Sequence, residues 1–195
     1  AIRYWQDKPV PRDLLEKVIE SASKAPSGSN LQPWVFVVID DAGTRKKIGG
    51  ALNDFYEGGP LKDMIAQGQQ VEDKSQRLMM QGAQAFFSKL ADAPAMIVPC
   101  LYQLASPTPD PTSLEAGSSI YMAVQNLMLS ARGLGLGTLM TTAHSLVNDT
   151  LREACGIPDD AYPVALIPIG YPDANFGPTK RKGLDEILQI GRAHV

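Results

Sequence analysis

Short hydroxyl and amide side chains are concentrated in residues 25–34, which read Ala-Pro-Ser-Gly-Ser-Asn-Leu-Gln-Pro-Trp. This segment falls between an expected helix and an expected buried strand, where its side chains could hydrogen-bond a ligand. The same residues also fit a structural role, in which Ser27 or Ser29 caps a turn and Asn30 stabilises it. On composition alone, both interpretations stay open.

A second candidate is the glycine run Gly133, Gly135 and Gly137, whose spacing superficially resembles a dinucleotide-binding fingerprint. That fingerprint needs a strand before the glycines and a helix after them, because the helix N-terminus binds the pyrophosphate. Here the expected order is reversed, with a long helix first and a strand afterwards. We therefore interpret the glycines as the end of a buried helix and a tight turn, whose amides could still face a ligand.

The usual sets of catalytic side chains do not occur in the sequence. Two histidines are too few for an ordinary metal cluster, so no metal site is expected. There is no Gly-x-Ser-x-Gly elbow, and neither Cys100 nor Cys155 lies in a nucleophile motif. What remains is chemistry supplied by an organic cofactor, for which the protein provides binding and orientation.

Composition and charge exclude several classes of protein. The 195 residues are 44% hydrophobic and 20% charged, which is typical of one globular domain, here residues 1–195. A net charge of −3 argues against nucleic-acid binding. No apolar run reaches the roughly 18 residues of a membrane span, so no membrane is expected. Two cysteines are too few for a disulfide framework, which favours free thiols and a reducing cytoplasm.

Apolar periodicity predicts the elements that must position these residues. A proline at position 11 begins the first helical pattern, and a β-branched apolar run marks the first buried strand. In chain order we expect a helix to about residue 25, a short turn or helix over 27–32, a strand over 35–39, a helix over 43–50, an irregular polar stretch over 56–68, a helix over 71–90, strands over 95–101, 138–142 and 162–169, and a loose basic tail.

The second half of the chain adds two features. Pro99 places the strand over 95–101 at an edge or near a strand end, since proline cannot donate to a sheet. Thr112 and Glu115 match a capping box for a helix that continues to Arg132 and is apolar on nearly every face. Such a helix is buried, in a core or in a subunit interface. Together the elements indicate an α+β fold, with a mixed sheet flanked by helices.

Four motifs in the same order resemble the nitroreductase family of flavoenzymes. The most specific is Pro-Ser-Gly-Ser-Asn-Leu-Gln-Pro-Trp at residues 26–34, followed by the apolar strand. The other three are the opening Ile-Arg-Tyr-Trp with its later Pro-Val-Pro, the Gln-Asn-Leu and glycine motifs at 125–138, and Pro-Thr-Lys-Arg-Lys at 178–182. The similarity spans about residues 3–190.

This resemblance implies a nitroreductase-like fold with a central mixed or antiparallel sheet flanked by helices. It also implies an intertwined homodimer with an FMN in each of two interface sites. Arg3 would lie near the flavin pyrimidine edge, and Lys180 and Arg181 would bind the FMN phosphate, with further basic residues expected before Ala1. The other implied cofactor-binding residues are Pro26, Ser27, Asn30 and Gln32 from the partner subunit, and Met140, Thr141 and Thr142 along the ring.

Each of these assignments has a structural alternative. Arg3 could be a solvated surface residue, residues 180–182 a solvated basic tail, and residues 141–142 simply strand formers. His144 is interpreted as a structural histidine. The aromatic residues at 55–56 are candidates for a substrate lid.

The activity that the resemblance implies is hydride transfer from NADH or NADPH, through flavin N5, to a small-molecule acceptor such as a nitroaromatic or a quinone. The cycle would be ping-pong, and no catalytic side chain is expected because the flavin performs the chemistry. Alternatives with the same fold are a reductive dehalogenase, a flavin-fragmenting enzyme and a deazaflavin-dependent reductase. A non-catalytic flavin-binding protein and a structural homodimer without cofactor are the alternatives from other classes.

Overall fold

Short strands form one antiparallel sheet in the computed structural model, which describes residues 1–104, 109–179 and 181–191. The strand order is β1-β2-β5-β3, and β4 also pairs with β2. Every pairing between these strands is antiparallel, so the α+β class and the antiparallel form of the sheet are confirmed. The strands are β1 (Trp34–Ile39), β2 (Ala95–Tyr102), β3 (Gly137–Thr138), β4 (Ala161–Pro163) and β5 (Ile167–Gly170).

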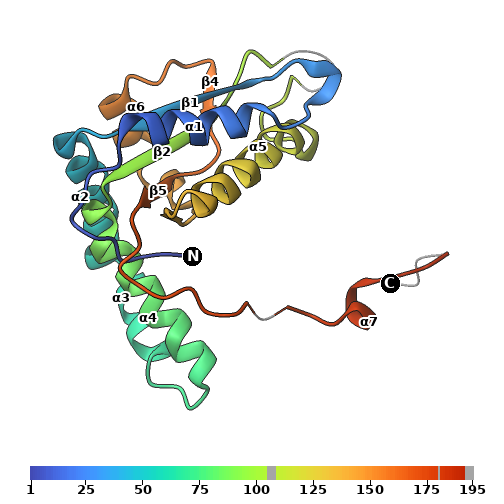
Figure 1. Cartoon of the computed structure of the whole chain (residues 1–195). Coiled ribbons are helices and arrows are strands. Elements are labelled where there is room, and N and C mark those ends of the chain that lie inside the picture. The colour runs from blue at the N-terminus through green and yellow to red at the C-terminus, as the bar shows by residue number, and fades with distance from the viewer. Residues whose placement is uncertain (105–108, 180, 192–195) are drawn as a thin grey trace.

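Helices cover both faces of this sheet. α1 and α5 run beside each other along one face (Figure 1), and α2, α4 and α6 contribute to the core on the other face. No helix in the described part of the chain is long and apolar enough to cross a membrane. The helices are α1 (Arg12–Ser23), α2 (Ala42–Gly58), α3 (Pro60–Gly68), α4 (Lys74–Lys89), α5 (Leu114–Gly133), α6 (Asn148–Cys155) and α7 (Leu184–Ile187).

The central strand β2 is apolar throughout because both of its faces are covered. Successive side chains of a strand point to opposite faces. Met96, Val98 and Cys100 lie in the core beneath α2, α4 and α6. Ala95 and Ile97 lie in the core beneath α1 and α5. The two helix layers are therefore joined through one strand.

Residues 56–68 are helical, so the expectation of an irregular stretch there is wrong. α2 continues to Gly58, and α3 begins after the single residue Gly59. Pro60 occupies the first helical position, where its missing N–H costs no hydrogen bond. The polar residues of this region lie on exposed helix faces, while Tyr56 and Ile65 point into the core.

Pro99 lies in a central strand, contrary to the expectation of an edge or a strand end. β2 pairs with β1 on one side and with both β4 and β5 on the other. The Val164 N–H donates to the Pro99 carbonyl at 3.0 Å, so Pro99 faces the break between β4 and β5, where no strand requires its N–H. The same break divides the single strand expected over 162–169 into two.

α5 begins one residue later than the capping box predicts. The hydroxyl of Ser113 accepts the Ala116 N–H at 3.1 Å and caps the helix. Thr112 is instead bonded to Asp110. A hydroxyl side chain was correctly expected to cap the start of the helix, but Ser113 supplies it in place of Thr112.

Apolar surface remains exposed on two elements that were expected to be buried. On α5, Tyr121, Met122 and Leu129 are 42%, 41% and 60% exposed, and Leu129 lies about two helical turns after the other two, on the same side of the helix. β1 is an edge strand, and Val35 and Val38 are both 37% exposed. One chain therefore buries only the sheet-facing side of α5.

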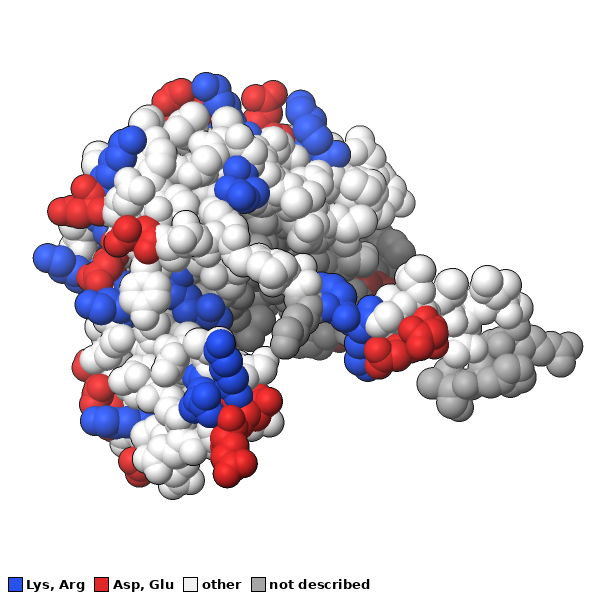
Figure 2. All heavy atoms as spheres, turned by 60° about the horizontal axis from the view of Figure 1, so that its bottom comes forward, with Lys and Arg blue, Asp and Glu red and all other residues white. Residues whose placement is uncertain are grey.

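The end of the chain leaves the body of the molecule (Figures 1 and 2). We call residues 177–179 and 181–191 the C-terminal arm. Just before it, the Phe176 ring lies 3.6 Å from the guanidinium carbon of Arg132, a cation–π contact at the end of α5. On the arm, Leu184, Ile187 and Ile190 are 71%, 62% and 88% exposed. These apolar side chains have no core of their own chain to enter.

Candidate functional site

The N-terminal segment that carries Arg3 is fixed by hydrogen bonds on both sides. The Ile2 N–H donates to the Thr138 carbonyl at 3.0 Å, and the Asp173 N–H donates to the Tyr4 carbonyl at 3.0 Å. Ile2 also packs closely on Gly137, where an added Cβ would lie 2.7 Å from the Ile2 side chain. The backbone of Arg3 is thus held between β3 and the segment that follows β5.

Arg3 projects into a cavity of about 420 Å³ at the junction of α4 and the segment after β3. Its Nε atom is buried and has no hydrogen-bond partner within the described chain. Among the described residues that line the cavity, Arg3 is the one with a formal charge. A buried, unpaired donor on a cation is costly unless an acceptor occupies the space in front of it. The site therefore suits a ligand that is electron-rich or anionic.

The sequence-predicted residues Met140, Thr141 and Thr142 line the same cavity as Arg3. The strand expected over 138–142 is shorter than predicted, because β3 ends at Thr138 and only Thr141 forms a further bridge, with Leu166. The Thr141 hydroxyl accepts the Ala143 N–H at 3.1 Å, which fixes its oxygen. Its hydroxyl hydrogen can still be directed at a ligand.

Two aromatic residues of α4, which sequence reasoning missed, also line the cavity. Phe86 and Phe87 line the cavity and contact each other edge-to-face, with ring centres 4.9 Å apart. Tyr56 stacks on Phe87 at 5.4 Å from beneath. Tyr56 is thus a buried core residue and does not belong to a lid, which corrects one sequence expectation, whereas Phe55 is 44% exposed. The adjacent aromatic pair in a helical pattern was the available signal.

The second group of predicted residues lies elsewhere in the chain. Pro26, Ser27, Asn30 and Gln32 precede β1, and none of them lines the Arg3 cavity. Pro33, the next residue, accepts the Tyr102 N–H through its carbonyl, which fixes the segment at the end of β2. One chain therefore does not bring the two groups of predicted residues together.

The segment before β1 is held in an unusual backbone conformation. Ser29, Asn30 and Gln32 have φ angles of 50°, 54° and 50°, in the left-handed region that non-glycine residues rarely adopt. The Ser27 hydroxyl accepts the Gln32 N–H at 2.9 Å, and Ser119 of α5 accepts the Gly28 N–H at 3.2 Å. Such strain persists only where the surroundings enforce it, and it is concentrated at functional sites.

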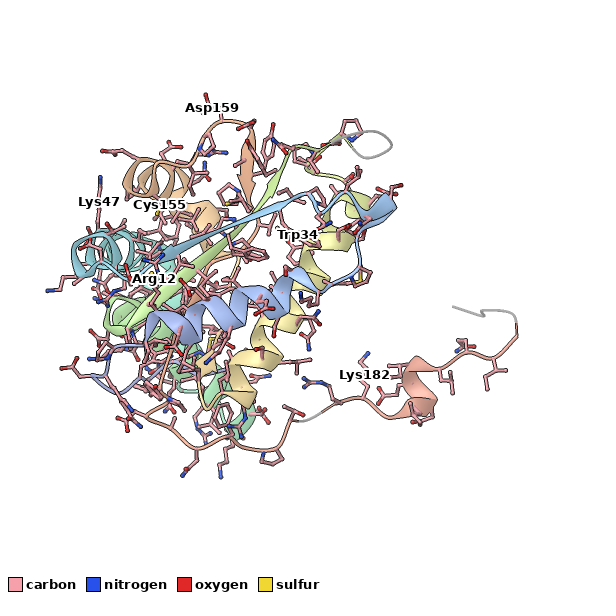
Figure 3. The ribbon with its side chains drawn as sticks, turned by 45° about the horizontal axis from the view of Figure 1, so that its top comes forward. Arg12, Trp34, Lys47, Cys155, Asp159 and Lys182 are labelled. Carbon is pink, nitrogen blue, oxygen red and sulfur yellow. The ribbon has the colours of Figure 1, made fainter. Side chains whose placement is uncertain are left out.

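Of the two predicted phosphate-binding residues, Lys180 lies outside the described residues. Arg181 is exposed and belongs to the C-terminal arm. Its neighbour Lys182 lies on the arm, away from the body (Figure 3). Arg181 is not among the residues that line the Arg3 cavity.

His144 has the structural role that the sequence analysis assigned to it. It is buried, and its Nε2 lies 3.0 Å from the Pro163 carbonyl, so Nε2 carries a hydrogen and donates. Burial lowers the pKa of His144, and the bond to Pro163 offsets this only in part. The ring is therefore buried in its neutral form.

This burial predicts a pH-dependent stability. Because the folded pKa of His144 lies below its unfolded value near 6.5, the unfolded state binds more protons below that pH. The stability that the neutral, buried His144 contributes is thus fully present above about pH 6.5 and is lost as the pH falls toward the lower pKa of the folded state. We expect His144→Gln, whose amide can donate to Pro163, to lose less thermal stability than the wild type between pH 7.5 and 5.5. The matched change at the other histidine, His194→Gln, serves as the control, and an equal slope in all three proteins would contradict the prediction.

The cysteines are free, as expected, and they carry no reactive thiolate. Cys100 is buried in β2, and burial raises the pKa of its thiol to about 12. Burial also raises the pKa of Cys155. The nucleophile in a thiol reaction is the thiolate, so neither residue is suited to covalent catalysis. In the described part of the chain, no cluster of ligating side chains could hold a metal ion.

The fold and the cavity thus define an antiparallel α+β protein with a cationic, aromatic-walled cavity, and no cysteine or histidine is among the described residues that line it. The profile described as "Nitroreductase family" matches residues 1–171. The chain belongs to the nitroreductase family. The resemblance inferred from the sequence motifs is therefore confirmed.

Two relatives are similar over most of the chain. Mouse iodotyrosine deiodinase 1 is 28% identical over 192 residues, which cover 96% of this chain and 65% of the deiodinase. The chain therefore spans less than two thirds of that relative. A putative NADH dehydrogenase/NAD(P)H nitroreductase from Methanothermobacter thermautotrophicus is 27% identical over 184 residues, which cover 91% of this chain and 75% of the relative.

Solved structures share the fold over nearly the whole chain. The FMN-dependent nitroreductase of Mycobacterium smegmatis, in complex with NADPH, has a TM-score of 0.72 at 20% identity, covering 98% of this chain and 94% of the other. A BluB-like flavoprotein from Clostridium difficile has the same TM-score, identity and coverages. At these identities the likeness shows the fold.

Proposed function

We propose that the protein is an FMN-dependent oxidoreductase that passes hydride from NADH or NADPH to a small-molecule acceptor, such as a nitroaromatic or a quinone. The observation that carries the proposal is the Arg3 cavity, which Arg3, whose buried Nε has no partner in the described chain, lines together with Phe86 and Phe87. Two relatives support it: the NAD(P)H nitroreductase homologue by sequence and the NADPH-bound, FMN-dependent nitroreductase by fold.

The residues of the cavity fit a flavin ring. Phe86 and Phe87 offer apolar surface to a flat aromatic system. Arg3 offers positive charge and an unused donor to the electron-rich pyrimidine edge. Thr141 and Thr142 offer hydroxyl groups along the ring. Bound FMN would supply the hydride chemistry at its N5, and these residues would bind and orient it and exclude water.

We also propose that the active form is an intertwined homodimer. The exposed apolar stripe of α5, defined by Tyr121, Met122 and Leu129, supports a contact between subunits. The exposed apolar residues of the C-terminal arm support an exchange of arms. In such a dimer the strained segment before β1 would complete the partner's site, with Pro26, Ser27, Asn30 and Gln32 approaching the flavin.

The phosphate of FMN would be held by the basic residues Lys180 and Arg181. A phosphate dianion is bound best by charge-assisted contacts, and the guanidinium of Arg181 can make two at once.

The free thiols of Cys100 and Cys155 support a reducing, cytoplasmic location for the enzyme.

A reductive dehalogenase is the second candidate. It is favoured by the similarity to mouse iodotyrosine deiodinase 1 over 96% of this chain. Both candidates require the same flavin site, so they differ in the acceptor and not in the cofactor.

The test is a visible spectrum of the purified protein, recorded anaerobically before and after addition of NADH or NADPH. We expect flavin bands that bleach with at least one donor and return when a nitroaromatic or a quinone is added. Recovery with iodotyrosine but with neither of those acceptors would select the dehalogenase. A protein that stays colourless after reconstitution with FMN would refute both candidates.

A further inference from the structure

Gly82 in the middle of α4 lies directly against the guanidinium of Arg3. A Cβ atom added at Gly82 would lie 3.1 Å from Arg3 Cζ, 3.2 Å from Nη1 and 3.3 Å from Nε. These are closer than ordinary van der Waals contacts, and all three atoms belong to the charged group. The missing side chain at position 82 therefore creates the space in which the guanidinium lies.

Gly82 lies on the face of α4 that carries the aromatic residues of the cavity. Residues four apart in a helix share a face, so Gly82 is aligned with Phe86, and Ala83 is aligned with Phe87. Ala83, Phe86 and Phe87 all line the Arg3 cavity. This face of α4 thus combines large rings with one position at which no side chain is present, and Arg3 fills that position.

We propose that Gly82 is a positioning residue that sets the location of the Arg3 guanidinium and, through it, how strongly the site favours the reduced flavin. The inference rests on the proposed function, because it takes FMN as the group that Arg3 faces. With any side chain at position 82, the guanidinium must move toward the cavity or away from its buried place. Its charge and its Nε donor would then meet the flavin in a different geometry.

The decisive variant is Gly82→Ala, because its two expected effects have opposite directions. Alanine is more favourable than glycine in a helix interior, and the atoms it meets are the end of a flexible side chain, so the cofactor-free protein is expected to melt at the same temperature or higher. FMN binding is nevertheless expected to weaken about tenfold, as charge-assisted contacts lose their geometry. The midpoint potential of the bound flavin is expected to fall, because the reduced form loses more stabilisation than the oxidised form.

Two controls isolate the contact with Arg3. Gly50→Ala places the same methyl group in the interior of α2, where nothing lies within 4 Å, so it is expected to leave FMN binding and potential unchanged. Adding Gly82→Ala to Arg3→Ala is expected to cause no further loss of FMN affinity, because Gly82 acts on the flavin only through the Arg3 guanidinium.

A measurement without cofactor separates this inference from the proposed function. In ¹⁵N-labelled protein free of FMN, the buried Arg3 Nε–H is expected to exchange slowly with solvent, and at least about tenfold faster in Gly82→Ala. Unchanged exchange in that variant would overturn the inference, as would an unchanged FMN affinity and potential. A wild-type protein that binds no FMN would refute the proposed function, while the exchange rate would still decide whether Gly82 positions Arg3.

Discussion

Replacing Arg3 by alanine is expected to weaken FMN binding by about 100-fold, since a charge-assisted contact from a buried donor is among the strongest single interactions available. The Arg3 Nε is buried without a partner among the residues that the structure describes, so its removal breaks no hydrogen bond of Nε there. The thermal stability of the cofactor-free protein is therefore expected to change little. Fluorescence titration of the cofactor-free protein with FMN measures the affinity.

Two variants sharpen the interpretation of that titration. Arg3→Lys keeps the charge but not the planar donor group, and it is expected to restore only part of the affinity. Arg12→Ala removes an exposed arginine that pairs with Glu16 on the surface of α1, and it is expected to bind FMN as the wild type does. If Arg3→Ala retained wild-type affinity, the cavity would not be the flavin site.

Replacing Leu129 by arginine is expected to separate the dimer into monomers and to remove most of the bound FMN. Leu129 is 60% exposed on the apolar stripe of α5, and an unpaired charge buried between two subunits is strongly destabilising. The dissociation constant of the dimer is expected to rise by at least about 100-fold. Analytical ultracentrifugation over a range of concentrations, combined with flavin absorbance, measures both effects.

The matched control for this variant is Met64→Arg, which introduces the same charge at an exposed apolar residue of α3. It is expected to leave the association state and the flavin content unchanged. Loss of the dimer with full retention of FMN in Leu129→Arg would separate the interface from the site, and it would remove the partner role proposed for the segment before β1.

The elements with one clear periodicity were predictable from the sequence. α1, β1, β2 and α5 lie within a few residues of their expected places, because each has an uninterrupted apolar pattern. Elsewhere, local composition was a poor guide to where helices and strands end. The polar residues 56–68 were expected to be irregular, yet the single residue Gly59 is the whole break between two helices.

The candidate site was predictable only where a motif marks it. Arg3 and residues 140–142 line one cavity, and the family resemblance had placed both beside the same ring. Gly82 and Phe86 were not found, since a glycine and a phenylalanine in a helix indicate nothing about a ligand until their neighbours are known. The distance between Gly82 and Arg3 depends on long-range packing, which no local pattern encodes.

The hydrogen bonds that hold the segment around Arg3 also determine when the cavity can form during synthesis of the chain. The Trp5 indole donates to the Gly137 carbonyl across 132 residues of sequence, and the Tyr4 carbonyl is bonded to Asp173 near the other end. The chain must therefore be synthesised past residue 173 before both of these bonds can hold the segment that carries Arg3. Until then the nascent protein has no completed cavity, and the proposed cofactor would find its site only after this segment has emerged.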